Sequence, residues 1–162
     1  MINLYDNFLS REDFSYIKEN IIDNRYFPWY HNDYKVTPED NIVQFTHMFY
    51  EKHNKNSEHY KFLEPILNII NPSAIRRIKA NITYREKDFK KFELHTDFNG
   101  NFENQKTGIF YMNTNNGKTV FDTDQEIDSV ENRFITFPAH LKHAGTTHTD
   151  VPIRCVINFN WY

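Results

Sequence analysis

The chain has little of what disulfide-stabilised or nucleotide-binding proteins need. Its 162 residues include one cysteine, Cys155, and four glycines. A single cysteine cannot form an internal disulfide, and four glycines leave little room for a glycine-rich phosphate-binding loop. No Walker-type or dinucleotide glycine motif is present. We therefore expect a fold held by its apolar core, in a reducing, cytoplasmic setting.

Long apolar runs and an excess of basic charge are lacking too. Even the apolar stretch FLEPILNII is short and interrupted by Glu64, Pro65 and Asn68, whereas a membrane-spanning helix needs about 18 apolar residues in a row. The amino terminus lacks the basic segment and apolar run of a secretory signal. A net charge of −3 and a pI near 6.2 make nucleic acid an improbable partner. We expect a soluble protein that binds no membrane.

The length is that of one ordinary domain, with a core large enough to stand without disulfides or structural metal. Ser10, with an acidic residue three positions on, resembles a capping box and predicts a helix over about residues 10 to 23. Apolar spacing predicts a second helix over about 57 to 70. We therefore expect a helical accessory region over about 1 to 72, followed by a strand-rich core over about 73 to 162.

The second part of the chain carries strand patterns. Residues 76 to 85 alternate between a mainly apolar and a polar set, and the basic members of the polar set are interpreted as a solvated strand face. Two extended runs flank Asn116-Gly117, a pair suited to a tight hairpin turn. Further short strands are expected at EIDSV, NRFITFP and IRCVINFNWY. This pattern predicts helices packed on an antiparallel sandwich or barrel, a mainly β fold of the α+β class.

Three His-x-Asp tripeptides offer candidate metal ligands: His31-Asn32-Asp33, His95-Thr96-Asp97 and His148-Thr149-Asp150. Residues i and i+2 of a strand project to the same side, so such a pair presents an imidazole and a carboxylate to one ion. A third ligand must then come from another strand. Only His95-Thr96-Asp97 follows one strong strand signal and precedes a series of others, which favours it over the other two.

The order of residues in the second part resembles a known family. The tripeptide HTD at 95 to 97 is followed by FPAHLKHAGTT, which contains His143, and by Arg154 eleven positions later. This combination resembles the iron(II) and 2-oxoglutarate-dependent oxygenases, particularly their prolyl-hydroxylase-like branch, over about residues 76 to 162. The resemblance implies a double-stranded β-helix, a cupin-like jelly roll, with amino-terminal helices on one side.

The resemblance also implies roles for individual residues. His95, Asp97 and His143 would be the facial ligands of Fe(II), and Arg154 would bind the distal carboxylate of 2-oxoglutarate. Tyr84 and Tyr111 match positions where related enzymes place tyrosine hydroxyls around this cosubstrate. The implied cofactors and cosubstrates are Fe(II), 2-oxoglutarate and O₂. The implied reaction is hydroxylation of a peptidyl proline, a free amino acid or another small substrate, with release of succinate and CO₂.

Each assignment has an alternative. Tyr84 and Tyr111 are also interpretable as core aromatics, and Arg154 as a surface strand residue. His140 is an alternative ligand to His143, which we prefer because Pro138 and the turn after it leave His143 better placed to begin the next strand.

The function has alternatives as well. A noncatalytic jelly-roll module that binds a metal or another ligand, and a cupin-like metalloenzyme that does not use 2-oxoglutarate, both fit the same strand pattern. Arg154 argues against both of them. The sequence does not predict the oligomeric state.

Overall fold

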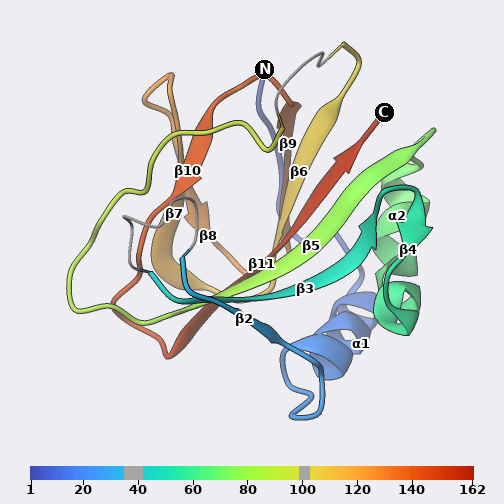
Figure 1. Ribbon diagram of the computed structural model, residues 1–162, viewed down its shortest axis with the longest axis horizontal. Coiled ribbons are helices and arrows are strands. Elements are labelled where there is room, and N and C mark those ends of the chain that lie inside the picture. The colour runs from blue at the N-terminus through green and yellow to red at the C-terminus, as the bar shows by residue number, and fades with distance from the viewer. Residues whose placement is uncertain (35–41, 99–102) are drawn as a thin grey trace.

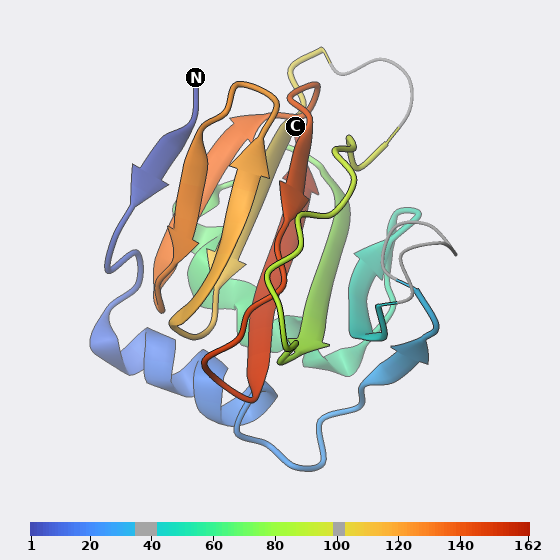
Figure 2. The same ribbon diagram turned by 90° about the vertical axis from the view of Figure 1, so that its left-hand side faces the viewer.

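The computed structural model describes residues 1–34, 42–98 and 103–162. Within these ranges the protein is mainly β, with two antiparallel sheets and two small α-helices (Figures 1 and 2). The strands are β1 (Asn3–Tyr5), β2 (Tyr30–Asn32), β3 (Gln44–Glu51), β4 (Asn54–Lys55), β5 (Ile75–Tyr84), β6 (Lys106–Tyr111), β7 (Asn115–Phe121), β8 (Glu126–Ser129), β9 (Arg133–Pro138), β10 (His143–Gly145) and β11 (Ile153–Trp161). The helical elements are α1 (Arg11–Ile21), the 3-10 helix η2 (Glu58–Leu63) and α2 (Glu64–Ile70). No described helix is long and apolar enough to cross a membrane.

The two sheets face each other as in a jelly roll. The large sheet has the order β1-β9-β6-β11-β5-β3-β2, with β4 paired to β3, and the small sheet has the order β10-β7-β8. The segment before Asp97 adds to the small sheet through isolated bridges from Lys91 to Thr146 and from His95 to His143. The expected mainly β, jelly-roll architecture is thus observed, and the strands expected at EIDSV, NRFITFP and IRCVINFNWY correspond to β8, β9 and β11.

Alternation along β11 separates two cores. Cys155, Ile157 and Phe159 are buried against α1 and α2 on one side of the large sheet. Val156, from the opposite face, packs with residues of β6, β7 and β9 between the two sheets. Because successive side chains of a strand point to opposite faces, one nine-residue strand contributes to both layers. The large sheet therefore lies between the helices and the small sheet, as the two ribbon views show (Figures 1 and 2).

The first 72 residues are not a helical region, and that part of the prediction is wrong. They contain the strands β1 to β4, of which β1 pairs with β9 and β3 pairs with β5 of the large sheet. The expected first helix is present as α1, where Ser10 Oγ accepts a hydrogen bond from Asp13 N at 3.1 Å. The expected second helix is divided into η2 and α2. Pro65 lies in the first turn of α2, where a proline displaces no helical hydrogen bond.

The hairpin predicted at Asn116-Gly117 is also wrong. Both residues lie inside β7, which pairs with β8 and β10 of the small sheet, whereas β6 lies in the large sheet between β9 and β11. Tertiary pairing therefore overrides a local turn signal. Gly117 instead lets the side chain of Arg154 lie close to β7, since a Cβ atom at Gly117 would be 3.0 Å from Arg154 Cδ.

Candidate metal centre and its pocket

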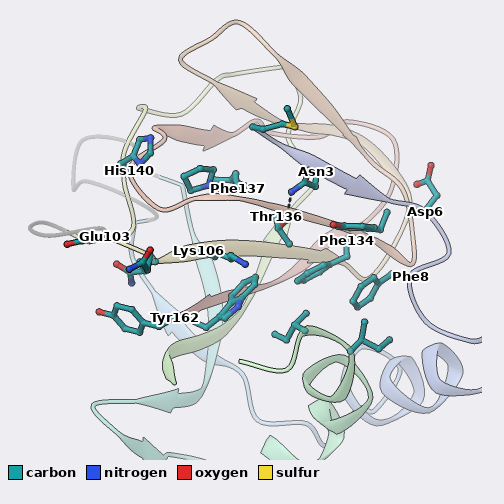
Figure 3. A pocket seen from close by; sticks show the side chains of 18 of the residues that line it. Asn3, Asp6, Phe8, Glu103, Lys106, Phe134, Thr136, Phe137, His140 and Tyr162 are labelled. Atoms are coloured by element: carbon teal, nitrogen blue, oxygen red, sulfur yellow. Dashed lines mark hydrogen bonds between the residues drawn. The ribbon is translucent and has the colours of Figure 1, made fainter. Parts of the chain in front are cut away.

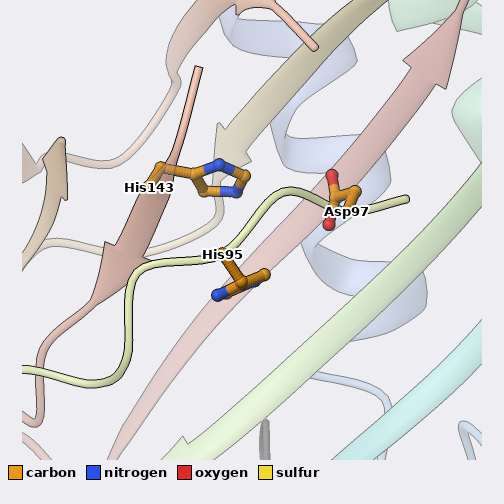
Figure 4. A group of neighbouring side chains, drawn as sticks. All are labelled: His95, Asp97 and His143. Atoms are coloured by element: carbon orange, nitrogen blue, oxygen red, sulfur yellow. The ribbon is translucent and has the colours of Figure 1, made fainter. Parts of the chain in front are cut away.

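Three side chains with metal-ligand chemistry converge between the two sheets. His95 and Asp97 lie on the segment that runs from β5 towards β6, and His143 is the first residue of β10. One ligand atom from each of the three lies within 4.8 Å of the others (Figure 4). The structure therefore brings together the tripeptide favoured in the sequence and the distal histidine preferred to His140.

Both imidazoles are oriented by backbone carbonyl groups. His95 Nδ1 lies 3.0 Å from the carbonyl oxygen of Glu93, and His143 Nδ1 lies 3.4 Å from that of Leu141. With Nδ1 protonated and donating, the Nε2 lone pair of each ring is left for another partner. Burial lowers the pKa of His143, which favours the neutral, ligating form of its ring.

The carboxylate of Asp97 is held from both sides. Arg77 Nη2 donates to Oδ1 at 2.8 Å, and Asn160 Nδ2 donates to Oδ2 at 2.7 Å. Burial by itself raises the pKa of Asp97, but the charge of Arg77 and the other groups around the carboxyl outweigh it and hold the pKa below its usual value. Asp97 is therefore an ionised, positioned carboxylate at neutral pH.

A pocket of about 80 Å³ connects these three residues to Arg154. Its floor includes Lys79, Asn81 and Thr83, which project from β5. Basic residues of β5 interpreted in the sequence as a solvated face thus lie at a pocket, because residues of the small sheet and of the segment that carries His95 and Asp97 line the same space. Sequence reasoning did not assign Lys79, Asn81 and Thr83 of β5, or Asn158 of β11, to the site. Their common signal is that they lie on the polar, period-two face of these strands.

Arg154 is buried, with 5% of its surface exposed, so it is not a surface residue. Its Nε donates to Ser129 Oγ at 3.0 Å, and its Nη2 lies 3.5 Å from Thr119 Oγ1. Among the described residues no carboxylate forms an ion pair with it. A buried guanidinium without an acidic partner is costly, and a planar guanidinium is suited to bidentate binding of a carboxylate.

The two tyrosines proposed from the sequence have different surroundings. Tyr111 is fully buried and donates its hydroxyl to Thr119 Oγ1 at 2.7 Å, next to the pocket, and burial raises its pKa to about 12. Tyr84 is 53% exposed and packs edge-on against Phe45 on the face of β5 opposite to Thr83. The structure therefore brings Tyr111 to the site and places Tyr84 outside it.

The other candidate histidines lie apart from the three converging side chains. His31 is exposed and pairs with the exposed Asp33 at 3.6 Å. His148 is buried, and neither ring nitrogen has a hydrogen-bond partner among the described residues. His140 is exposed on an outer hollow.

That outer hollow is the larger one, with a volume of about 1230 Å³, but none of the three converging side chains lines it. It lies along β1, β6 and β9, where residues such as Phe8, Phe134 and Tyr162 line it (Figure 3). Because size alone does not identify a reactive site, we assign the candidate site to the smaller, polar pocket, where convergent ionisable groups meet.

No protein-family model and no curated protein matches the sequence. Solved structures do match it in fold. An oxidoreductase of the 2OG-Fe(II) oxygenase family from Burkholderia pseudomallei is 11% identical, with a TM-score of 0.74 over 99% of this chain and 84% of that one. A prolyl hydroxylase from Trichoplax adhaerens, in complex with a hypoxia-inducible-factor peptide fragment, is 13% identical, with a TM-score of 0.67 over 99% and 82% of the two chains.

A third solved structure is a non-heme, alpha-ketoglutarate-dependent epimerase from nogalamycin biosynthesis. It is 9% identical, with a TM-score of 0.71 over 99% of this chain and 77% of that chain. The chain thus has the fold of the 2OG-Fe(II) oxygenase structures over nearly its whole length. These neighbours differ in the reaction named for them, so the shared fold is compatible with more than one chemistry.

Proposed function

We propose that the protein is an Fe(II)- and 2-oxoglutarate-dependent dioxygenase. The observation that carries this proposal is the placement of two features in one pocket. They are the cluster of His95, Asp97 and His143, and the buried guanidinium of Arg154, which pairs with no carboxylate of the described residues. A metal and a dicarboxylate are the two ligands that such a pocket suits together. The fold shared with 2OG-Fe(II) oxygenase structures supports it.

The three converging side chains fit iron in their chemistry. Two imidazoles and one carboxylate on one side of an ion, with positions left open, form the facial triad typical of non-heme Fe(II) oxygenases. The carbonyl contacts of the two imidazoles and the two hydrogen bonds to Asp97 supply the outer partners that orient such ligands. His95, Asp97 and His143 would therefore hold the metal.

Arg154 would bind the distal carboxylate of 2-oxoglutarate. Burial strengthens this ion pair, since little water competes for the guanidinium. Thr119 lies beside it, and its hydroxyl is held by Tyr111. Tyr111 thus acts through Thr119 and keeps a polar hydroxyl next to the carboxylate site.

Bound Fe(II) and 2-oxoglutarate would supply the activation of O₂, with succinate and CO₂ as products of the 2-oxo acid and one oxygen atom transferred to the substrate. The protein's own residues orient these ligands and keep water away from them. Ile109 and Val156 line the pocket with apolar surface and limit the water that reaches it. The polar floor on β5 supplies hydrogen-bonding groups within the same pocket.

For the substrate we propose a peptidyl proline, a free amino acid or another small molecule, hydroxylated at carbon. The neighbouring structures include a prolyl hydroxylase with a bound peptide fragment and an epimerase of a biosynthetic pathway. They support both a peptide and a small molecule as candidates. A screen of peptides and metabolites for a mass gain of one oxygen would identify the substrate.

The proposal is tested by adding Fe(II) and 2-oxoglutarate to the purified protein without oxygen. We expect a metal-to-ligand charge-transfer band in the visible spectrum and calorimetric binding of 2-oxoglutarate that depends on metal. Metal binding without 2-oxoglutarate binding would favour a cupin-like metalloenzyme, and binding of neither would favour a noncatalytic module; both results overturn the proposal.

A further inference from the structure

The pocket contains a second cation besides Arg154. Lys79 projects from β5 into the same pocket as Asp97 and Arg154 and is partly buried. Among the described residues its ammonium group makes no hydrogen bond and no ion pair. The acidic groups that act on it, Asp97 and Glu51, are too far away to pair with it.

The groups around Lys79 do not replace an anionic partner. Arg77, two residues earlier on the same face, is occupied by Asp97 at 2.8 Å. Asn81, two residues later, accepts a hydrogen bond from Gln44 at 3.2 Å. Across the strand pair, Lys79 is in register with Asn158, whose Oδ1 is buried and has no hydrogen-bond partner. A lysine without an ion pair among the described residues and an unpaired amide oxygen therefore lie on neighbouring strands at this pocket.

Such an arrangement costs stability in the absence of a ligand. A shielded charge without a counter-charge is unfavourable, and polar groups in protein interiors are normally paired. Burial, together with the charge of Arg77, lowers the pKa of Lys79, as expected for a cation that lacks a partner. Polar or charged residues that lower stability because they lack a partner are typical of binding sites.

We propose that Lys79 binds a carboxylate group of a ligand that lies beside Asp97. This inference rests on the proposed function and deepens it. Arg154 would take the distal carboxylate of 2-oxoglutarate, so the carboxylate at Lys79 belongs either to the other end of the cosubstrate or to the substrate that is oxidised. In the second case the substrate is a free amino acid or another small carboxylic acid rather than an internal proline of a peptide.

The test compares wild-type protein with Lys79→Met, which keeps the length of the side chain and removes its charge. Binding of 2-oxoglutarate and of pyruvate to the Mn(II)-loaded proteins is measured by calorimetry. Binding of free amino acids and of the matching amino-acid amides to the proteins loaded with Mn(II) and 2-oxoglutarate is measured by ligand-observed NMR. Lys118→Met removes an exposed lysine that pairs with Glu126 and serves as the matched control.

Two results support the inference and show whether the carboxylate belongs to the cosubstrate or to the substrate. If Lys79→Met weakens the binding of both 2-oxo acids by at least about tenfold, the carboxylate is that of the cosubstrate. If 2-oxo acid binding is unchanged and wild type prefers amino acids to their amides, whereas Lys79→Met does not, the carboxylate is that of the substrate. Lys79→Arg should keep the preference in either case, because it keeps the charge.

Equal behaviour of wild type and Lys79→Met towards all of these probes overturns the inference. Circular dichroism shows whether the variant is folded, and its melting temperature should rise, because an unpaired shielded charge has been removed. If wild type binds neither Mn(II) nor 2-oxoglutarate, the proposed function fails. The amino acids and amides are then compared on the metal-free proteins, where a preference that depends on Lys79 would still support a carboxylate site and the lack of one would overturn it.

Discussion

His95 and His143 are joined directly through their backbones. His95 N donates to the carbonyl oxygen of His143 at 3.0 Å, and His143 N donates to that of His95 at 2.9 Å. This is a hydrogen-bonded antiparallel pair, in which the two side chains project to the same face of the sheet. Their ring centroids are 5.1 Å apart. The separation of two proposed ligands is thus set by a backbone ladder rather than by flexible loops, which is the kind of support that a preorganised site needs.

The first prediction concerns this pair. His95→Ala removes an imidazole from the cluster without removing a backbone hydrogen bond, so the fold should survive and metal binding should be lost. Loss of an outer partner alone typically weakens a metal site by about 10- to 100-fold, so loss of a ligand should weaken it by more than that. Calorimetry with Mn(II) and circular dichroism on the same sample measure the two effects.

The other His-x-Asp pairs provide controls for the first prediction. His31→Ala changes an exposed histidine and should leave metal affinity unchanged. His148→Ala should also retain the metal, because His148 lies outside the cluster. Loss of metal by His148→Ala together with retention by His95→Ala would show that the wrong tripeptide has been chosen.

The second prediction separates the cosubstrate from the metal. Arg154→Ala removes the proposed carboxylate partner and leaves all three proposed ligands in place. The loss of a charged hydrogen-bonding partner typically costs about 1.5 to 3 kcal/mol, so 2-oxoglutarate should bind at least about tenfold more weakly while Mn(II) affinity is retained. Arg85→Ala, at an exposed position outside the pocket, is the control. Unchanged 2-oxoglutarate affinity in Arg154→Ala would refute its assignment.

The third prediction concerns the buried ion pair of Arg77 and Asp97 and its pH dependence. The pKa of Asp97 is held below its usual value, so the ionised group stabilises the fold above about pH 4, and this stabilisation is lost as the pH falls through the lowered pKa. Arg77→Met leaves burial as the dominant influence and should raise that pKa. The free energy of unfolding at pH 7 should fall by about 3 kcal/mol or more.

Urea denaturation between pH 4 and pH 7 measures this effect. Acid destabilisation should begin at a higher pH in Arg77→Met than in wild type. Arg76→Met is the matched control, because Arg76 is the neighbouring arginine and donates to Gln105 instead of Asp97. The same pH dependence in Arg77→Met and Arg76→Met would show that the ion pair does not control the ionisation of Asp97.

The fourth prediction uses the close approach at Gly117. A Cβ atom there would lie 2.9 Å from Asn115 Oδ1, 3.0 Å from Arg154 Cδ and 3.2 Å from His148 Cβ, so Gly117→Ala should displace the arginine side chain. We expect weaker 2-oxoglutarate binding with unchanged Mn(II) affinity, and a loss of stability of about 1 to 3 kcal/mol.

Gly108→Ala is the control for the fourth prediction. Its added Cβ would lie 2.6 Å from Phe134 Cζ and 2.8 Å from a ring atom of Trp161, in the core on the other side of the sheet. This variant should lose stability without a selective loss of 2-oxoglutarate binding. If both variants affect 2-oxoglutarate equally, the effect of Gly117→Ala is general destabilisation.

Several later strands and the order of the candidate residues were predictable from the sequence alone. Apolar alternation and spacing, which depend on local chain geometry, identified the strand β5 and the later strands β8, β9 and β11. The choice of His95-Thr96-Asp97 among three similar tripeptides also came from its local context. The capping pattern at Ser10 marked the start of α1 correctly, because capping involves only neighbouring residues.

Only the tertiary structure decided which strands pair and which faces are covered. The turn signal at Asn116-Gly117 was overridden because β6 and β7 find their partners in different sheets. The polar face of β5 looked solvated because residues that share its pocket, such as His143 and Arg154, come from far along the chain. For the same reason, sequence spacing did not reveal the partners of Asp97 or the position of Lys79 in the pocket. Local propensity acts over a few residues, whereas burial and pairing depend on long-range contacts, which the period of a strand does not specify.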